Sequence, residues 1–356
     1  MKILAIETSC DETAAAVVSK NPKENHVKVL SNVVASSLIL HAKTGGIIPD
    51  VAAREQLKFI IPVTERAIED CKLKIETLDA IAVTYGPGLI GSLLIGVETA
   101  KTLAYLWKKP IIPVNHLLGH IYANWLITPN EKQLTTNKKL EVSSQKLEVE
   151  FPAIALLVSG GHTDLLLVKN HNDFKWLGGT RDDAAGEAFD KIGRLLNLPY
   201  PAGPTIEKLS EGGDVSRFTF PRPMIGSKDF DFSFSGLKAA VWRETKITKQ
   251  FDDKTIADIC ASVQKSIVEV LVRKTVKAAR KYNVKSILLG GGVTANQKLR
   301  ESLELEARRY TLNAKIFCPQ KIFCTDNAAM IGAYACFHPK KTDWKKLTAN
   351  PELYFS

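Results

Sequence analysis

The chain repeats its own layout, and this repeat limits what it can fold into more than any other feature. Residues 2–18 (KILAIETSCDETAAAVV) and 153–168 (AIALLVSGGHTDLLLV) are each an apolar run, a tight polar turn and a second apolar run. This pattern is typical of a β-hairpin. Both halves then continue with alternating helix and strand patterns. In the first half, helices are expected at 52–70, at 91–107 and from Asn115, and strands at 79–88 and 110–114. In the second half, helices are expected at 255–282, at 295–309 and from Thr325, and strands at 285–292 and 314–319. The alternation predicts βαβ units and two similar lobes that face a cleft.

The expected domains follow from this repeat. We predict an N-terminal lobe over 1–127, a polar insertion or linker over 128–150, and a C-terminal lobe over 151–325. A mainly helical insertion is expected at about 182–245, and a final helix and tail over 326–356 should pack near the cleft. A length of 356 residues agrees with two lobes. The duplicated α/β layout resembles the actin/sugar kinase/Hsp70 superfamily, whose members hold a nucleotide in the cleft between the lobes.

Composition excludes several classes of protein. The chain is 45% apolar and 24% charged, and no apolar run reaches the roughly 18 residues of a membrane helix. The first residues lead directly into a core strand, so no signal or transit peptide is expected. Six scattered cysteines without CxxC pairs argue against a zinc ribbon and a secreted disulfide scaffold. We therefore expect a cytoplasmic protein with no membrane association.

The net charge of +10 fits a polyanionic partner such as RNA, although a generally basic surface explains it equally well. No sequence signature of an RNA-binding module is present, and the aromatic residues are not interleaved with Lys and Arg.

Two histidines are the best candidates for metal ligands. His116 and His120 in NHLLGH are spaced i, i+4, which places both imidazoles on one face of a helix. Asp326 occupies the equivalent helix start in the second half, so it should face them across the cleft. Two histidines and a carboxylate form a facial triad suited to Fe(II) or Zn. The alternatives are capped or core histidines, and an Asp326 that is an N-cap, alone or as well as a ligand.

Glycine-rich turns are candidates for phosphate binding. They are SGGHTD (159–164), GPGLIG (86–91) and LGGGVTAN (289–296). Glycine allows the backbone to approach a phosphate, and a following helix N-terminus attracts negative charge. None is a Walker A loop, and each alone is as easily a plain turn, but their equivalent places in the two halves favour a nucleotide site.

Several further residues, most of them acidic, are weaker candidates for binding or catalysis. Asp183, Glu187 and Asp190 are spaced along one face of the expected helix 182–196, either to bind ribose or as a solvated face. Gly203 lies between two prolines and either admits a sugar or base or is only a turn. Asp11 and Glu12 in the first hairpin turn either orient a nucleophile or metal, or serve the turn itself.

These motifs together resemble the TsaD family, in its bacterial and organellar form. The resemblance rests on ETSCDETAAAVV, HAKTGGIIPDVAAREQ, YGPGLIGSLLIG, NHLLGHIYA, LLVSGGHTDLL, DDAAGEAFDKIGRLL, YPAGP, DFSFSGLK, LGGGVTANQKLR and TDNAAMIGAYA, which span nearly the whole chain in order. The insertion at 128–150 is longer than the family pattern.

The resemblance implies an acyltransferase that modifies tRNA. Such an enzyme moves the threonylcarbamoyl group from threonylcarbamoyl-AMP to N6 of the adenosine 3′ of the anticodon, in tRNAs reading ANN codons, and AMP leaves. It also implies one divalent metal ion per chain, iron or zinc, on His116, His120 and Asp326. The implied adenylate site, which ATP or ADP can also occupy, comprises Leu157, Val158, Ser159, Gly160, Gly161, Asp190, Gly203 and Asn296.

Partners implied by the resemblance are tRNA, a TsaB-like paralogue, a TsaE-like ATPase and an upstream threonylcarbamoyl-AMP synthase. For catalysis, we assign Asp11 as the acceptor of the amine proton, with Glu12 beside it. The alternative functions are an ATP-dependent phosphotransferase, a metalloprotease and a non-catalytic RNA-binding scaffold. A protease is disfavoured because Leu117 stands where HExxH has its glutamate.

Overall fold

The computed structural model describes residues 1–128, 148–247 and 252–355. Most of the predicted insertion at 128–150 therefore lies outside the described residues. The chain divides into two compact units, one of Met1–Leu40, Ile47–Val149 and Thr325–Ser356 and the other of His41–Gly46 and Glu150–Cys324. The C-terminal helix and tail thus belong to the first unit.

The first unit is built on a six-stranded mixed sheet in the order β5-β4-β1-β2-β3-β6. β1 and β2 form the predicted antiparallel hairpin, β3 pairs antiparallel with β2, and β4 and β5 extend the sheet in parallel from β1. The bounds are β1 Lys2–Glu7, β2 Glu12–Ser19, β3 Val27–Ser36, β4 Ala80–Gly86, β5 Ile111–Asn115 and β6 Leu126–Ile127.

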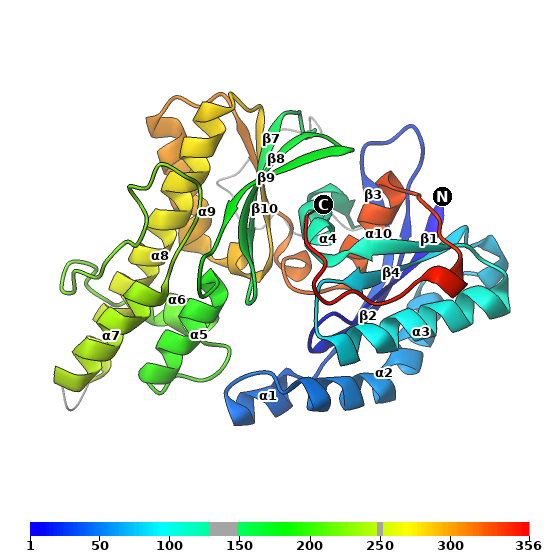
Figure 1. Ribbon diagram of the computed structural model, residues 1–356, viewed down its shortest axis with the longest axis horizontal. Helices are drawn as coiled ribbons and strands as arrows, with labels where there is room; N and C mark the ends of the chain where they lie inside the picture. The colour runs from blue at the N-terminus through cyan, green and yellow to red at the C-terminus, as the bar shows by residue number, and fades with distance from the viewer. Residues whose placement is uncertain (129–147, 248–251, 356) are drawn as a thin grey trace. The chain divides into compact units, whose positions relative to one another are not determined.

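Helices cover both faces of this sheet (Figure 1). α2 (Pro49–Asp70) and α3 (Ile90–Trp107) pack on one face, and α10 (Ala328–Phe337) packs on the other. Side chains of a strand alternate between faces, so Ile6 joins the α2–α3 core whereas Ala5 lies under α10. The remaining elements are α1 Leu38–Thr44, η1 Ile75–Thr77, α4 His116–Tyr122, η2 Ala123–Trp125 and η6 Trp344–Lys346.

The second unit repeats the same plan. Its five-stranded sheet has the order β11-β10-β7-β8-β9, with β7–β8 and β8–β9 antiparallel and β10 and β11 parallel to β7. The strands are β7 Ala153–Val158, β8 Thr163–Asn170, β9 Asp173–Gly179, β10 Ser286–Gly290 and β11 Lys315–Phe317. Strand order and direction match β5-β4-β1-β2-β3 of the first unit, so the predicted duplication is confirmed.

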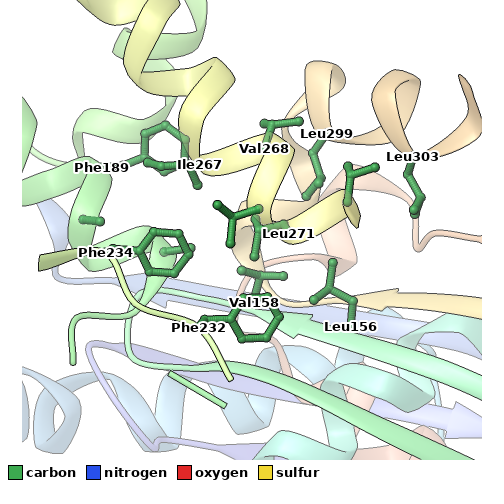
Figure 2. Packing of buried hydrophobic residues seen from close by; sticks show 14 of the residues in the cluster. Leu156, Val158, Phe189, Phe232, Phe234, Ile267, Val268, Leu271, Leu299 and Leu303 are labelled. Carbon is green, nitrogen blue, oxygen red and sulfur yellow. The ribbon is translucent and has the colours of Figure 1, made fainter. Parts of the chain in front are cut away.

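A large hydrophobic core lies in the second unit (Figure 2). Leu156 and Val158 of β7 pack with Leu271 of the long helix α8 (Asp253–Lys281), and Phe232 and Phe234 join this cluster. The predicted helical insertion is therefore part of the core. The other helices are α5 Ala185–Leu195, α6 Ala202–Ser210, α7 Ser235–Ile247, η4 Gly292–Ala295, α9 Gln297–Arg309 and η5 Lys321–Phe323.

The structure differs from the prediction in three respects. The third strands β3 and β9 and the short α1 were not predicted. α5 begins at Ala185, so Asp183 precedes the helix that was expected to carry it. α10 begins at Ala328 with Asn327 as its N-cap, so the N-cap alternative for Asp326 is wrong. None of the helices in the described ranges is long and apolar enough to cross a membrane.

Candidate functional site

The first unit brings His116, His120 and Asp326 together. Asn115, the last residue of β5, caps α4 by accepting from the amides of Leu117 and Leu118, so both histidines lie on the first turns of this helix. α4 packs against α10, and Asp326 lies just before α10. The three candidate ligands therefore come from one unit, and the prediction that Asp326 faces the histidines across the cleft between the lobes is wrong.

Gly119 lies where α4 packs against α10. A Cβ at this position would lie 2.8 Å from Ile331 Cδ1 of α10, closer than side chains normally approach. A side chain at this position would therefore require the end of the Ile331 side chain to shift.

The donor atoms of this cluster fit a divalent metal ion. His120 Nε2 lies 3.2 Å and His116 Nε2 3.6 Å from Asp326 Oδ1. Each residue offers a ligand atom, all within 4.8 Å of one another. Both histidines are buried, and neither ring nitrogen of His120 makes a hydrogen bond within the described residues. Two imidazoles and a carboxylate are ligands that Fe(II) and Zn(II) share, so the cluster can hold such an ion.

A residue that the sequence analysis missed contacts this cluster. His116 Nδ1 lies 2.9 Å from Glu7 Oε2 and 3.1 Å from Ser9 Oγ. Glu7 is fully buried at the end of β1. The sequence did contain a signal for Glu7, which is the carboxylate at the end of the otherwise apolar run ILAIE. A charged side chain is seldom buried in a core unless it has a partner.

The pKa values of these groups follow from their surroundings. Burial alone lowers the pKa of His116, but the charges of Glu7 and Asp326 and the hydrogen bond to Glu7 raise it to about 9. Burial outweighs the attraction of the nearby Asp326 carboxylate and lowers the pKa of His120. Burial raises the pKa of Glu7, yet the charge and hydrogen bond of His116 bring it below its usual value.

Asp11 and Glu12 also lie in the first unit, Asp11 in the turn after β1 and Glu12 as the first residue of β2. Burial, together with the charges of Asp326 and Asp11, raises the pKa of Glu12 well above its ordinary value. The buried Gln56 of α2 holds this turn, because its Nε2 lies 3.0 Å from Cys10 O and 2.9 Å from Glu12 O. Asp11 and Glu12 therefore lie on backbone that Gln56 holds in place, and the negative charge of Asp326 acts on Glu12.

The second unit contains the candidate nucleotide residues. Ser159, Gly160 and Gly161 form the turn between β7 and β8, and a Cβ on either glycine would meet nothing within 4 Å. The first turn of α5 packs on this turn, since Gly186 N donates to Ser159 O at 3.2 Å. Open backbone beside a helix N-terminus is typical of a phosphate-binding turn.

One further turn of the second unit, at Gly291, lies close to these residues. Gly291 has a φ of +91°, and a Cβ there would lie 2.4 Å from Val158 O. η4, which follows Gly291, packs against α5 and β7. The side chains of Leu157 and Val158 are fully buried, so only their backbone atoms are available to a ligand.

The N-termini of α6 and α9 involve the other three candidates, Asp190, Gly203 and Asn296. Asp190 Oδ1 accepts from Ala202 N at 2.7 Å, at the N-terminus of α6 that also carries Gly203. Burial raises the pKa of Asp190 despite hydrogen bonds from the amides of Ala202 and Gly203. Asn296 caps α9 by accepting from Leu299 N, and its Nδ2 donates to Gln264 Oε1.

Two of the three predicted acidic residues form ion pairs with lysines. Asp183 pairs with Lys191 and Lys238, at 2.6 and 3.1 Å, and Glu187 pairs with the same Lys191 at 2.8 Å. Within the described residues, Asp190 is thus the one member of the three that forms no ion pair with a lysine. The interpretation of the other two as ribose ligands loses support.

Comparisons with known proteins agree with this geometry. HypF from T. kodakarensis has a TM-score of 0.60 at 15% identity, covering 95% of this chain and 48% of that protein. Full-length HypF in its phosphate- and nucleotide-bound form has a TM-score of 0.57 at 12% identity, covering 95% of this chain and 46% of that protein. At these identities the likeness shows the fold alone, and it agrees with the predicted actin/sugar-kinase-like architecture.

Relatives of known name are much more similar in sequence. The tRNA N6-adenosine threonylcarbamoyltransferase of Syntrophomonas wolfei is 45% identical over 98% of this chain and 95% of its own length. The protein of the same name from Thermosipho africanus is 47% identical over 93% of this chain and 92% of its own length. The family model described as tRNA N6-adenosine threonylcarbamoyltransferase matches residues 28–333. The chain therefore belongs to the TsaD family.

Proposed function

We propose that this protein is a transferase that makes threonylcarbamoyladenosine in tRNA. The observation that carries this proposal is the family match over residues 28–333, together with relatives of that name at about 45% identity over most of the chain. The His116, His120 and Asp326 cluster supports it, because the family resemblance implies a metal on these residues.

The reaction joins two substrates. We propose that threonylcarbamoyl-AMP is the donor and that the acceptor is N6 of the adenosine 3′ of the anticodon, in tRNAs reading ANN codons. The new bond joins N6 to the carbamoyl carbon, the bond from this carbon to the phosphate oxygen breaks, and AMP leaves. ATP or ADP is expected to compete for the adenylate site.

Residues of the first unit supply the chemistry in this proposal. His116, His120 and Asp326 would hold one Fe(II) or Zn(II), which when bound polarises phosphate and carbamoyl oxygens as a Lewis acid. Asp11 takes the proton that leaves the exocyclic amine, and Glu12 helps to orient that amine. The amine is a weak nucleophile, so positioning supplies much of the rate acceleration.

Residues of the second unit bind the adenylate in this proposal. The open Gly160–Gly161 backbone donates its amides to phosphate oxygens, and the backbone from Leu157 to Ser159 lines the turn. Asp190 and Gly203 at the start of α6 bind the ribose or base, and Asn296 holds the start of α9. The interlobe position of this nucleotide site remains a prediction.

The proposed protein partners are a TsaB-like paralogue and a TsaE-like ATPase, with a threonylcarbamoyl-AMP synthase upstream. α2 offers an apolar contact surface, because Leu57 is 65% and Ile61 48% exposed, whereas Ile60 on the same helix is only 4% exposed. Exposed apolar side chains grouped on a helix favour a protein partner over solvent.

A basic surface near the C-terminus is our candidate for tRNA contact. Lys340, Lys341, Lys345 and Lys346 are exposed. Trp344 beside them lines a hollow of about 570 Å³ together with Tyr105, Lys108 and Lys109. Lysines next to exposed aromatic rings are typical of nucleic-acid contact surfaces. A tRNA substrate also supports a cytoplasmic location, as proposed from the sequence.

The alternative functions have less support. An ATP-dependent phosphotransferase of the actin/sugar-kinase superfamily leaves the histidine cluster without a role, and the family match does not favour it. A metalloprotease lacks its general base, since Leu117 is a fully buried apolar residue.

Mass spectrometry of tRNA nucleosides tests the proposed function. The purified chain is incubated with unmodified tRNA, threonine, bicarbonate, ATP and the partner proteins, and threonylcarbamoyladenosine is expected. The His116→Ala/His120→Ala variant is the matched control and should give none. Consumption of ATP on a small acceptor with no modified nucleoside would instead support the phosphotransferase alternative.

A further inference from the structure

Glu7 is a buried carboxylate whose two oxygens both accept hydrogen bonds. Oε1 accepts from the amide of Ser9 at 2.5 Å, and Oε2 accepts from Thr84 Oγ1 at 2.6 Å. The same Oε2 lies 2.9 Å from His116 Nδ1. All of these groups are almost completely buried, so water does not replace any partner that is removed.

The contact with Glu7 decides which nitrogen of His116 carries the proton. A neutral imidazole has one N–H and one lone pair, and an ionised carboxylate only accepts. In the neutral ring that a metal ion requires, the proton therefore lies on Nδ1, 2.9 Å from Glu7 Oε2, and the lone pair lies on Nε2, which is 3.6 Å from Asp326 Oδ1. Only a nitrogen with a free lone pair can bind a metal ion.

We propose that Glu7 is a positioning residue for the metal centre. Its carboxylate fixes the tautomer and the ring orientation of His116, so that Nε2 is presented to a divalent cation together with His120 and Asp326. This inference rests on the metal-binding part of the proposed function and not on the transfer reaction. His120 has no such hydrogen bond among the described residues, so the orienting contact is specific to His116.

A purely structural role is the alternative. Glu7 also joins β1 to β4 through Thr84, so its loss can destabilise the first unit without any effect on the metal. Thr84→Val separates the two roles, since it removes a hydrogen bond to the same Oε2 and leaves the contact with His116 in place.

Glu7→Gln is the informative variant because the amide has one acceptor oxygen where the carboxylate has two. If that oxygen faces Ser9 N, the NH₂ group faces His116 Nδ1 and drives the proton to Nε2, the metal-facing atom. If the oxygen faces His116, the NH₂ group opposes the amide of Ser9 and the side chain shifts. Either arrangement weakens metal binding, and removal of such outer partners typically costs 10- to 100-fold in affinity.

The experiment measures Zn(II) affinity of the metal-free, full-length protein by competition with a chromogenic chelator. Glu7→Gln is expected to weaken binding about 10- to 100-fold and to alter the visible spectrum of the Co(II)-substituted protein. Thr84→Val should stay within about threefold of the wild type. Equal affinities for Glu7→Gln and the wild type, or equal losses in both variants, would overturn the proposal.

A measurement on the unaltered chain covers the case in which Glu7→Gln does not fold. Nitrogen-15 NMR of the Zn(II)-bound protein distinguishes the two ring nitrogens of His116. The expected result is a protonated Nδ1 and a metal-bound Nε2, and the reverse assignment would overturn the proposal. A wild-type chain that binds no divalent ion would remove the metal centre itself, whereas a chain that binds metal but fails to modify tRNA would remove only the transfer function.

Discussion

His120 Nε2 lies 3.2 Å from Asp326 Oδ1, although neither ring nitrogen of this buried histidine makes a hydrogen bond within the described residues. A buried imidazole without hydrogen bonds loses free energy unless another ligand occupies its lone pair. A divalent cation between the two side chains would bind Nε2 and remove its share of this penalty, and the predictions for the site start from this pair.

The first prediction concerns metal content. His116→Ala, His120→Ala and Asp326→Ala should each lower the metal content well below one ion per chain, because each removes one of a small set of ligands. Elemental analysis of the purified proteins measures this. His26→Ala, a histidine of the same unit outside the cluster, should keep full occupancy. Full occupancy in the His116→Ala/His120→Ala double variant would rule out the site.

The second prediction concerns the nucleotide turn. Gly161→Val should leave the fold intact, since a Cβ there meets no atom within 4 Å, yet it should weaken AMP or ADP binding at least about tenfold by filling space that a phosphate needs. Gly226→Val is a matched control, because its Cβ is equally free of neighbours and it lies outside the three glycine-rich turns. Calorimetry that finds unchanged affinity in a folded Gly161→Val protein would move the nucleotide site elsewhere.

The third prediction concerns acid stability. The Asp258 carboxylate accepts from Asp214 N at 2.6 Å and pairs with Arg217 and Lys254, and these contacts lower its pKa to about 2. A pKa below the unfolded value of about 3.9 stabilises the fold above that value, and the contribution disappears as pH falls toward 2. Asp258→Asn should therefore lower the urea midpoint at pH 7, and its difference from the wild type should shrink between about pH 4 and 2. A difference that does not change with pH would show that the charge is not responsible.

The fourth prediction concerns tRNA. Binding should weaken steeply with added salt, because neutralising phosphates releases counterions. Lys345→Ala/Lys346→Ala should lower the affinity and reduce the salt slope by roughly one for each phosphate that is no longer neutralised. Lys175→Ala, at an exposed position on β9, serves as the control and should change neither quantity. Salt-independent binding would remove the basic surface from the proposal.

The fifth prediction concerns the apolar surface of α2. Leu57→Asp should weaken the complex with a TsaB-like partner while leaving the stability of the isolated chain within about 0.5 kcal/mol, because the side chain is 65% exposed. The partner affinity should depend little on salt, in contrast to that for tRNA. A chain that modifies tRNA at full rate without the partner would show that this surface has another role. The family resemblance implies that the organellar members act without this partner.

Residue spacing alone predicted much of this protein. Period-two and period-3.6 patterns located both hairpins and most helices, because they depend only on which face of an element is buried. The same patterns predicted the His116–His120 pair, since i, i+4 residues share a face of any helix. β3 and β9 were missed because their residues are mixed in polarity and because the local sequence does not reveal the strands with which they pair.

Other features were decided by tertiary packing. α10 belongs to the first unit although its sequence follows the second, because its small residues pack on β1 and β2. Glu7 lies 109 residues from His116, and its contact with Nδ1 exists only when β1, β5 and α4 are assembled. Asp183 likewise pairs with Lys191 and Lys238, whereas Asp190 accepts from Ala202 N. Sequence therefore determined the chemistry available in this chain, whereas long-range packing decided which groups meet, since hydrogen bonds and ion pairs depend on distances that local periodicity does not define.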